Sequence, residues 1–184
     1  MTIPDDSSKK HQLRKAMRRI LLAGPLDSAH VCEAARRWLL ARPGLRTVAL
    51  YAALPGEVDL LPLVAWDPGR RWVFPRISGE DLAFHEVREP ANDLACSTGS
   101  IREPSPALPC VPIPEIDVFL CPGLAFDPNG GRLGRGRGYY DRALGSARPD
   151  ALKLGICHPV QCVADTFRQA HDVAMDQLIT GSVE

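Results

Sequence analysis

The 184-residue sequence lacks any imbalance of charge, because Lys and Arg together number 22 and Asp and Glu also number 22. A net charge of zero gives no global electrostatic case for binding nucleic acid or a membrane surface. No apolar run approaches the ~20 residues that a membrane-spanning helix needs. Residues 1–17 also lack the apolar centre of a signal peptide. We therefore expect a cytoplasmic protein without a nucleic-acid or membrane partner.

The sequence is also without the signatures of a disulfide framework, a cysteine metal site or a catalytic triad. Its six cysteines include no Cys-x-x-Cys pair, and the chain is neither short nor evidently secreted. No Ser/His/Asp or Cys/His set stands out either. We assign no role to the cysteines, which are Cys32, Cys96, Cys110, Cys121, Cys157 and Cys162.

What the sequence does contain is a regular series of helical and strand patterns. Residues 7–22 carry one apolar stripe among six basic residues, with Ser7 or Ser8 as the cap and Gly24-Pro25 as the stop. A second helix is predicted over 28–41, and shorter ones over 60–66 and from 139 to 144. Apolar runs predict strands at 47–54, 71–77, 82–87, 116–120, 152–157 and near 177–180.

The alternation of strands with helices predicts an α/β fold with a mainly parallel central sheet flanked by helices, Rossmann-like and three-layered. The segment 102–114 contains five prolines, and we interpret it as an extended crossing segment. Because both of its flanks look like parts of one sheet, we expect a single domain over residues 1–184.

The glycine-rich stretch Gly130–Arg142, GGRLGRGRGYYDR, is the strongest local signal. If the chain is extended here, the alternating glycines leave one side of the backbone without side chains, so that N–H groups can approach an anion. If the chain is curled, the glycines allow the backbone N–H groups to form an anion-binding nest. Arginine guanidinium groups can add bidentate contacts to phosphate oxygens. The stretch predicts a phosphate-binding loop, with a solvated surface turn as the alternative.

Neither familiar nucleotide motif accounts for this loop. Gly131 and Gly136 have the Walker spacing, but Arg137 and Gly138 follow where Lys and Ser or Thr are needed. The dinucleotide fingerprint fails as well, because the third glycine falls one place early. Asp141 suits Mg²⁺ beside phosphates or, alternatively, a helix start.

Several separated stretches, taken together, resemble the 5-formyltetrahydrofolate cyclo-ligase family. They are KHQLR, YAALPGEVDL, FPRI, DVFLCPGLAFDPNGGRLGRGRGYYDRAL and HDVAMDQLIT, in the family's order. The resemblance implies ATP-dependent closure of 5-formyltetrahydrofolate to 5,10-methenyltetrahydrofolate, with release of ADP and phosphate. ATP would phosphorylate the formyl oxygen, and the folate N10 would then attack the activated carbon. ATP as co-substrate, Mg²⁺ and the folate are the implied ligands.

The resemblance also implies a role for individual residues. Arg132, Tyr140 and Asp141 would be catalytic, Asp141 and Asp172 would bind the metal, and Tyr51, Leu54, Glu57 and Tyr140 would contact the folate, with Glu57 near the pterin. The nucleotide would be bound by Lys10, Arg14, Arg132, Leu133, Gly134, Arg135, Gly136, Arg137, Gly138, Tyr139 and Tyr140.

The sequence departs from the family pattern at two places. Phe167 and Gln169 stand where members usually have Pro-x-Glu, which predicts weaker metal or substrate binding if that glutamate takes part. Arg135 and Arg137 stand where many members have an aromatic residue and a glycine, which predicts tighter phosphate binding. The competing hypothesis is a non-catalytic nucleotide- or RNA-binding module that keeps the fold. The expected assembly is a monomer or a homodimer.

Overall fold

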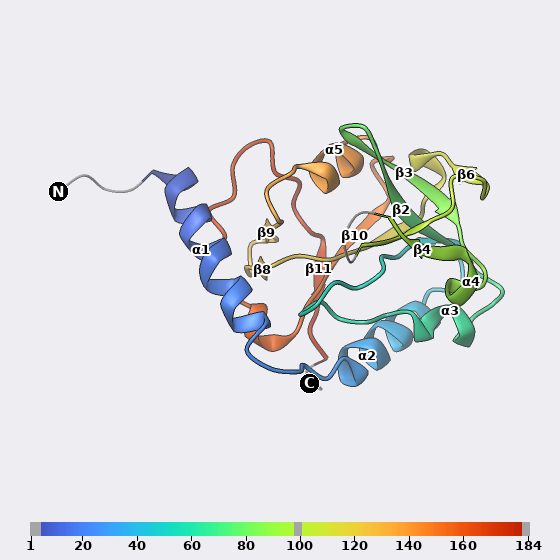
Figure 1. The fold of residues 1–184 in the computed structure, drawn as a ribbon, viewed down its shortest axis with the longest axis horizontal. Coiled ribbons are helices and arrows are strands. Elements are labelled where there is room, and N and C mark those ends of the chain that lie inside the picture. The colour runs from blue at the N-terminus through green and yellow to red at the C-terminus, as the bar shows by residue number, and fades with distance from the viewer. Residues whose placement is uncertain (1–4, 98–100, 182–184) are drawn as a thin grey trace.

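A seven-stranded sheet organises the fold in the computed structural model, which describes residues 5–97 and 101–181 (Figure 1). The helices are α1 (Asp6–Leu21), α2 (Ala29–Leu40), α3 (Pro62–Trp66), α4 (Pro90–Asp93) and α5 (Tyr139–Gly145), with 3-10 turns at Ile113–Glu115 and Pro159–Gln161. The strands are β1 (Thr47–Ala49), β2 (Arg71–Ser78), β3 (Asp81–Glu86), β4 (Leu94–Cys96), β5 (Arg102–Pro104), β6 (Cys110–Val111), β7 (Val118–Cys121), β8 (Ala125–Phe126), β9 (Arg132–Leu133), β10 (Leu152–Ile156) and β11 (Gln177–Ile179).

The order of the strands in the sheet creates a point where the chain changes direction. The order is β11-β10-β7-β1-β2-β3-β6; the first five strands are parallel, and β3 and β6 are antiparallel. From β1 the chain continues to β2 on one side, whereas β7 lies on the other side of β1 and leads to β10 and β11. The predicted mainly parallel α/β sheet is confirmed, and its topological switch point lies between β1 and β7.

Helices cover both faces of this sheet, as expected for buried parallel strands. Helices α2 and α3 pack on one face, where Leu39 and Leu63 join a large apolar cluster. On the other face, Ala143 and Leu144 of α5 pack with Phe119 of β7. Figure 1 shows these two layers below and above the sheet. The three-layer prediction is therefore confirmed.

Helix α1 lies off the sheet and packs against the small β8–β9 hairpin. Met17 and Leu21 of its apolar stripe contact a cluster that includes Leu124 and Leu133. Its cap differs from the prediction: the Asp5 carboxylate accepts the Ser8 N–H at 2.8 Å, so the helix starts before Ser7. Within the described residues, none of the helices is both long and apolar enough to cross a membrane.

Short-range patterns misjudged three stretches. The strand predicted over 47–54 ends at Ala49, because the chain beyond it leaves the ladder to line a cavity. The crossing segment 102–114 holds β5 and β6, which pair with β4 and β3. The hairpin of β8 and β9 was not predicted, since each strand has only two residues. The two strands pair with each other, and such short strands leave no periodic pattern in the sequence.

Candidate active site

A cavity of about 880 Å³ opens at the carboxyl ends of β1 and β7. Tyr51 and Ala52 follow β1, and Pro122 and Gly123 follow β7, so both sides of the switch point contribute to its wall. Open α/β sheets bind ligands at this position, where neighbouring connections diverge and leave a crevice. The volume lies within the range of small-molecule sites.

Every residue that the sequence predicted to contact nucleotide, folate or metal lines this one cavity. The cavity is also lined by residues that the sequence analysis did not single out, including an apolar wall formed by β2, β3 and the segment before β5. That wall contains Pro75, Ile77, Leu82 and Ile101. Two of these residues belong to the FPRI motif, which was recognised as a family signature but given no role.

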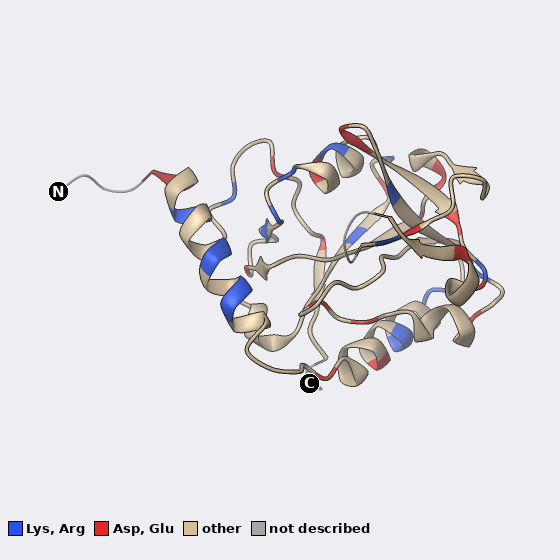
Figure 2. Ribbon diagram, viewed as in Figure 1, with Lys and Arg blue, Asp and Glu red and all other residues tan. Residues whose placement is uncertain are grey.

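Helix α1 supplies basic side chains to one end of the cavity. Lys10 is buried, and its Nζ lies 2.5 Å from Asp172 Oδ2. Arg14, one turn later, donates from Nε to the Gly134 carbonyl at 3.0 Å. Figure 2 shows this basic helix facing the equally basic chain between β9 and α5. The basic face of α1 that carries Lys10 and Arg14 is thus in part a wall of the cavity.

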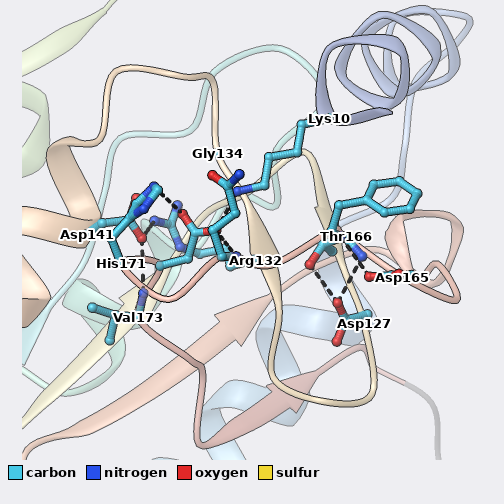
Figure 3. A network of polar contacts seen from close by, with 12 residues as sticks. Lys10, Asp127, Arg132, Gly134, Asp141, Asp165, Thr166, His171 and Val173 are labelled. Carbon is cyan, nitrogen blue, oxygen red and sulfur yellow. Dashed lines mark hydrogen bonds and ion pairs between the residues drawn. The ribbon is translucent and has the colours of Figure 1, made fainter. Parts of the chain in front are cut away.

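Arg132 and Asp141 form the central ion pair of the site. Arg132 Nη2 lies 3.1 Å from Asp141 Oδ1, and Nη1 donates to the Pro122 carbonyl at 3.4 Å (Figure 3). The Arg132 side chain is only 4% exposed, yet its Nε finds no hydrogen-bond partner among the described residues. Buried guanidinium donors are normally all satisfied, so an unpaired one beside a cavity is a position for a ligand oxygen.

Tyr140 presents a second unpaired polar atom. Its ring lies under the Arg132 guanidinium, 5.2 Å from centroid to Cζ, and its hydroxyl has no partner within the described part of the chain. Burial, and after it the neighbouring Cys121 and Glu57, raises the pKa of Tyr140 well above its ordinary value. Tyr140 is therefore a neutral phenol that can donate a hydrogen bond into the cavity.

The glycine-rich loop is curled. Gly136 has φ +99° and Gly138 has φ +69°, a region that is costly for residues with a side chain. Gly138 is the N-cap residue of α5. Of the two geometries considered for the loop, the curled one is therefore present at these positions. It directs the chain from β9 around the end of the cavity and back into α5.

Glu57 projects from the turn after β1 and contacts this loop. Its Oε2 accepts the Leu54 N–H at 3.0 Å, and its Oε1 accepts Arg135 Nη2 at 2.9 Å and Nε at 3.1 Å. The side chain of Glu57 is 7% exposed and that of Arg135 is 38% exposed. The carboxylate predicted to contact the pterin is therefore already engaged by one of the two arginines that depart from the family pattern.

Asp127, which the sequence analysis did not single out, has a buried carboxylate that holds the start of the glycine-rich loop at Gly131. Asp127 accepts hydrogen bonds from the backbone of Asn129, Gly131 and Thr166 and from the Thr166 hydroxyl at 2.6 Å (Figure 3). Its burial would raise the pKa, but these hydrogen bonds outweigh it and hold the pKa below its ordinary value. Asp127 thereby ties the β8–β9 turn to the segment that precedes Asp172.

Each of the two predicted metal ligands accepts its hydrogen bonds through one carboxylate oxygen, and the second oxygen of Asp172, Oδ1, lies 3.5 Å from His171 Nε2. Asp141 Oδ1 accepts from Arg132 and, at 3.4 Å, from the Val173 N–H, whereas Oδ2 has no hydrogen bond to the described residues. Asp172 Oδ2 accepts from Lys10 and from the Gln169 N–H at 2.7 Å. No group of three or more His, Cys, Asp or Glu side chains gathers for a metal in the described ranges. Two aspartates at one cavity suit Mg²⁺, which takes one or two carboxylates with phosphate oxygens and water.

The departures near Asp172 have a structural basis. Phe167 has φ +58°, and a proline, whose φ is fixed near −65°, cannot adopt that conformation. The Asp165 carboxylate accepts the Phe167 N–H at 2.7 Å, and Lys9 Nζ lies 5.4 Å from the ring centroid. The backbone here must therefore follow a different path from one that carries the family's proline. Gln169 lines the cavity and holds Asp172 through its backbone.

Comparison with known proteins identifies the family. The sequence model of the 5-formyltetrahydrofolate cyclo-ligase family matches residues 6–181. The chain belongs to this family. Among curated members of the cyclo-ligase family, the 5-formyltetrahydrofolate cyclo-ligase of Mycolicibacterium smegmatis is 34% identical over 80% of each chain. That of Escherichia coli K12 is 30% identical over 82% of this chain and 87% of its own.

Solved structures agree with this cyclo-ligase assignment. The NMR structure of Aquifex aeolicus 5,10-methenyltetrahydrofolate synthetase has a TM-score of 0.80 and 30% identity, and it covers 95% of this chain and 90% of its own. The corresponding synthetase of Mycoplasma pneumoniae shares the fold at 23% identity and a TM-score of 0.79, over 94% and 99% of the two chains. These relatives are enzymes, which favours the ligase over a non-catalytic module.

Proposed function

We propose that this protein closes 5-formyltetrahydrofolate to 5,10-methenyltetrahydrofolate at the expense of ATP, releasing ADP and phosphate. The observation that carries the proposal is the cavity at the switch point, which is lined by Arg132 and Tyr140, each with a buried polar atom that has no partner among the described residues. Unpaired donors of this kind suit phosphate or formyl oxygens. Membership of the cyclo-ligase family supports the same reaction.

The chemistry needs positioning more than a protein nucleophile. The formyl oxygen attacks the terminal phosphorus of ATP, ADP leaves, and the phosphorylated oxygen becomes a good leaving group. N10 of the same folate then attacks the formyl carbon, loses its proton, and phosphate departs as the ring closes. The protein must align two substrates and stabilise charge on the moving phosphoryl group. The absence of a Ser/His/Asp set from the sequence fits this demand.

We assign the nucleotide to the basic end of the cavity and the folate to the part of the cavity near Glu57. Lys10, Arg14 and the loop from Arg132 to Tyr140 hold the nucleotide phosphates, where guanidinium and ammonium groups gather. Arg132 and Tyr140, whose buried Nε and hydroxyl lack partners among the described residues, would donate to the phosphoryl and formyl oxygens. Glu57 accepts N–H groups of the pterin edge, and Tyr51 and Leu54 line the same pocket. The apolar wall of β2 and β3 covers the flat parts of the substrates.

Asp141 is the proposed Mg²⁺ ligand, through the oxygen that Arg132 does not use. Bound Mg²⁺ would neutralise negative charge on the phosphate oxygens. Asp172 already holds Lys10 and the Gln169 N–H. Its other oxygen, Oδ1, lies 3.5 Å from His171 Nε2, and we propose that the main contribution of Asp172 is to position Lys10.

The test is to mix the purified protein with 5-formyltetrahydrofolate, Mg²⁺ and ATP and to follow the near-ultraviolet absorbance of the methenyl product. We expect product that depends on ATP. A folded protein that yields no more product than the control without ATP overturns the proposal. Glu57→Gln should raise KM for the folate more than KM for ATP. An effect confined to ATP would contradict the pterin assignment.

A further inference from the structure

Arg135 occupies the carboxylate that the proposed function assigns to the folate. Two of its nitrogen atoms, Nε and Nη2, donate to the same oxygen, Oε1 of Glu57, at 3.1 and 2.9 Å. The other oxygen, Oε2, accepts the Leu54 N–H. Because Oε1 already accepts two N–H groups from Arg135, it can accept a pterin N–H on favourable terms only after Arg135 leaves it.

The pair is asymmetric in burial, which decides which partner can move. The Glu57 side chain is 7% exposed and is fixed to its own turn by the Leu54 N–H. The Arg135 side chain is 38% exposed and carries a flexible apolar stem. In the described residues, Arg135 is the only cation that forms an ion pair with Glu57. The guanidinium is therefore the mobile partner, and the carboxylate is the fixed one.

The backbone that carries Arg135 is held independently of this ion pair. Arg14 Nε donates to the Gly134 carbonyl at 3.0 Å, and Arg18 Nη2 donates to the Arg135 carbonyl at 3.4 Å. Glycines on both sides leave the arginine side chain free of neighbouring side chains in sequence. The side chain can thus change its partner while helix α1 keeps the loop backbone in place.

The same loop provides the proposed phosphate site, so Arg135 has a second anionic partner whenever a nucleotide is bound. We propose that Arg135 is a positioning residue. In the free enzyme its guanidinium occupies Glu57 Oε1, and it leaves this oxygen when it binds the nucleotide phosphates. Released Glu57 Oε1 then accepts a pterin N–H. The inference rests on the proposed function and adds a coupling between its two substrate sites.

The coupling has a measurable size and must act in both directions. Coupling between two ligands is typically about 5- to 150-fold in affinity, and each ligand must tighten the other by the same factor. We expect the nucleotide to tighten folate binding about tenfold, within that range, because a partly exposed ion pair must be opened. By linkage, the folate should tighten nucleotide binding by the same factor.

The experiment is isothermal titration of 5-formyltetrahydrofolate into the protein, with and without Mg²⁺ and a β,γ-imido analogue of ATP that cannot be hydrolysed. Wild type is compared with Arg135→Met and Arg135→Gln, which keep the length of the stem and remove the charge. Arg137→Met is the matched control, since it removes a neighbouring loop arginine whose side chain makes no ion pair with a described residue.

The expected result is that both Arg135 variants bind the folate alone nearly as tightly as wild type does with nucleotide, and that the tenfold coupling disappears. Arg137→Met should weaken nucleotide binding but leave unchanged the factor by which bound nucleotide tightens folate binding. Weaker folate binding by the Arg135 variants in the absence of nucleotide would overturn the proposal, as would a wild type without coupling. A wild type that turns over but shows no coupling refutes this inference alone, whereas one that neither turns over nor binds the folate refutes the proposed function.

Discussion

Replacing Arg132 by alanine removes the centre of the proposed site. Its guanidinium is 4% exposed, pairs with Asp141 at 3.1 Å, and has an unpaired Nε beside the cavity. Loss of one preorganised donor to developing negative charge costs about 2.7–4 kcal/mol, or about 10²–10³ in kcat. The change also leaves the Asp141 carboxylate without its cation. We therefore expect kcat for methenyl formation to fall by at least about 10²-fold.

Two further variants separate catalysis from folding. Arg132→Lys keeps the charge but not the planar fork, so it should recover only part of the lost activity. Arg148→Ala is the matched control, because Arg148 forms a 2.7 Å ion pair with Asp117 outside the cavity. It should lower the midpoint of urea unfolding while leaving kcat/KM near the wild-type value. Arg132→Ala with kcat within about twofold of wild type would show that the site has been placed wrongly.

Three other predictions concern the metal and the support of the loop. Asp141→Asn should raise the Mg²⁺ concentration needed for half-maximal turnover; an unchanged requirement would contradict its role as ligand. Gly131→Ala should lower the free energy of unfolding in urea by about 2 kcal/mol or more, because a Cβ there would collide with the Asp127 carboxylate and the Thr166 hydroxyl; wild-type stability would refute this. Since the pKa of Asp127 is lowered from 3.8, its stabilising effect is present above that pH and is lost as the pH falls further. Thr166→Val should therefore be less stable than wild type at neutral pH, with a gap that narrows below about pH 3.8; a gap independent of pH would argue against the Asp127 contact.

The sequence by itself determined the class of fold and predicted that the glycine-rich stretch is an anion-binding loop. Apolar runs such as 118–121, which the structure buries on both faces, are typical of parallel strands, and the stripe of Met17 and Leu21 predicts an amphipathic helix. The alternating glycines and arginines predict an anion site because both residue types act locally, through backbone conformation and charge. These properties belong to single segments, and a pattern within about twenty residues is enough to express them.

Only the tertiary structure decided which segments meet. Lys10 and Asp172 are 162 positions apart, and Glu57 and Arg135 are 78 positions apart. Their pairing depends on the order β10-β7-β1-β2, which brings the turns after β1 and β7 to one crevice. Asp127 likewise acquires its role only through Thr166, which is 39 positions away in the sequence. Local periodicity reports burial of a segment but carries no information about its partner, because strand order is fixed by the packing of the whole chain.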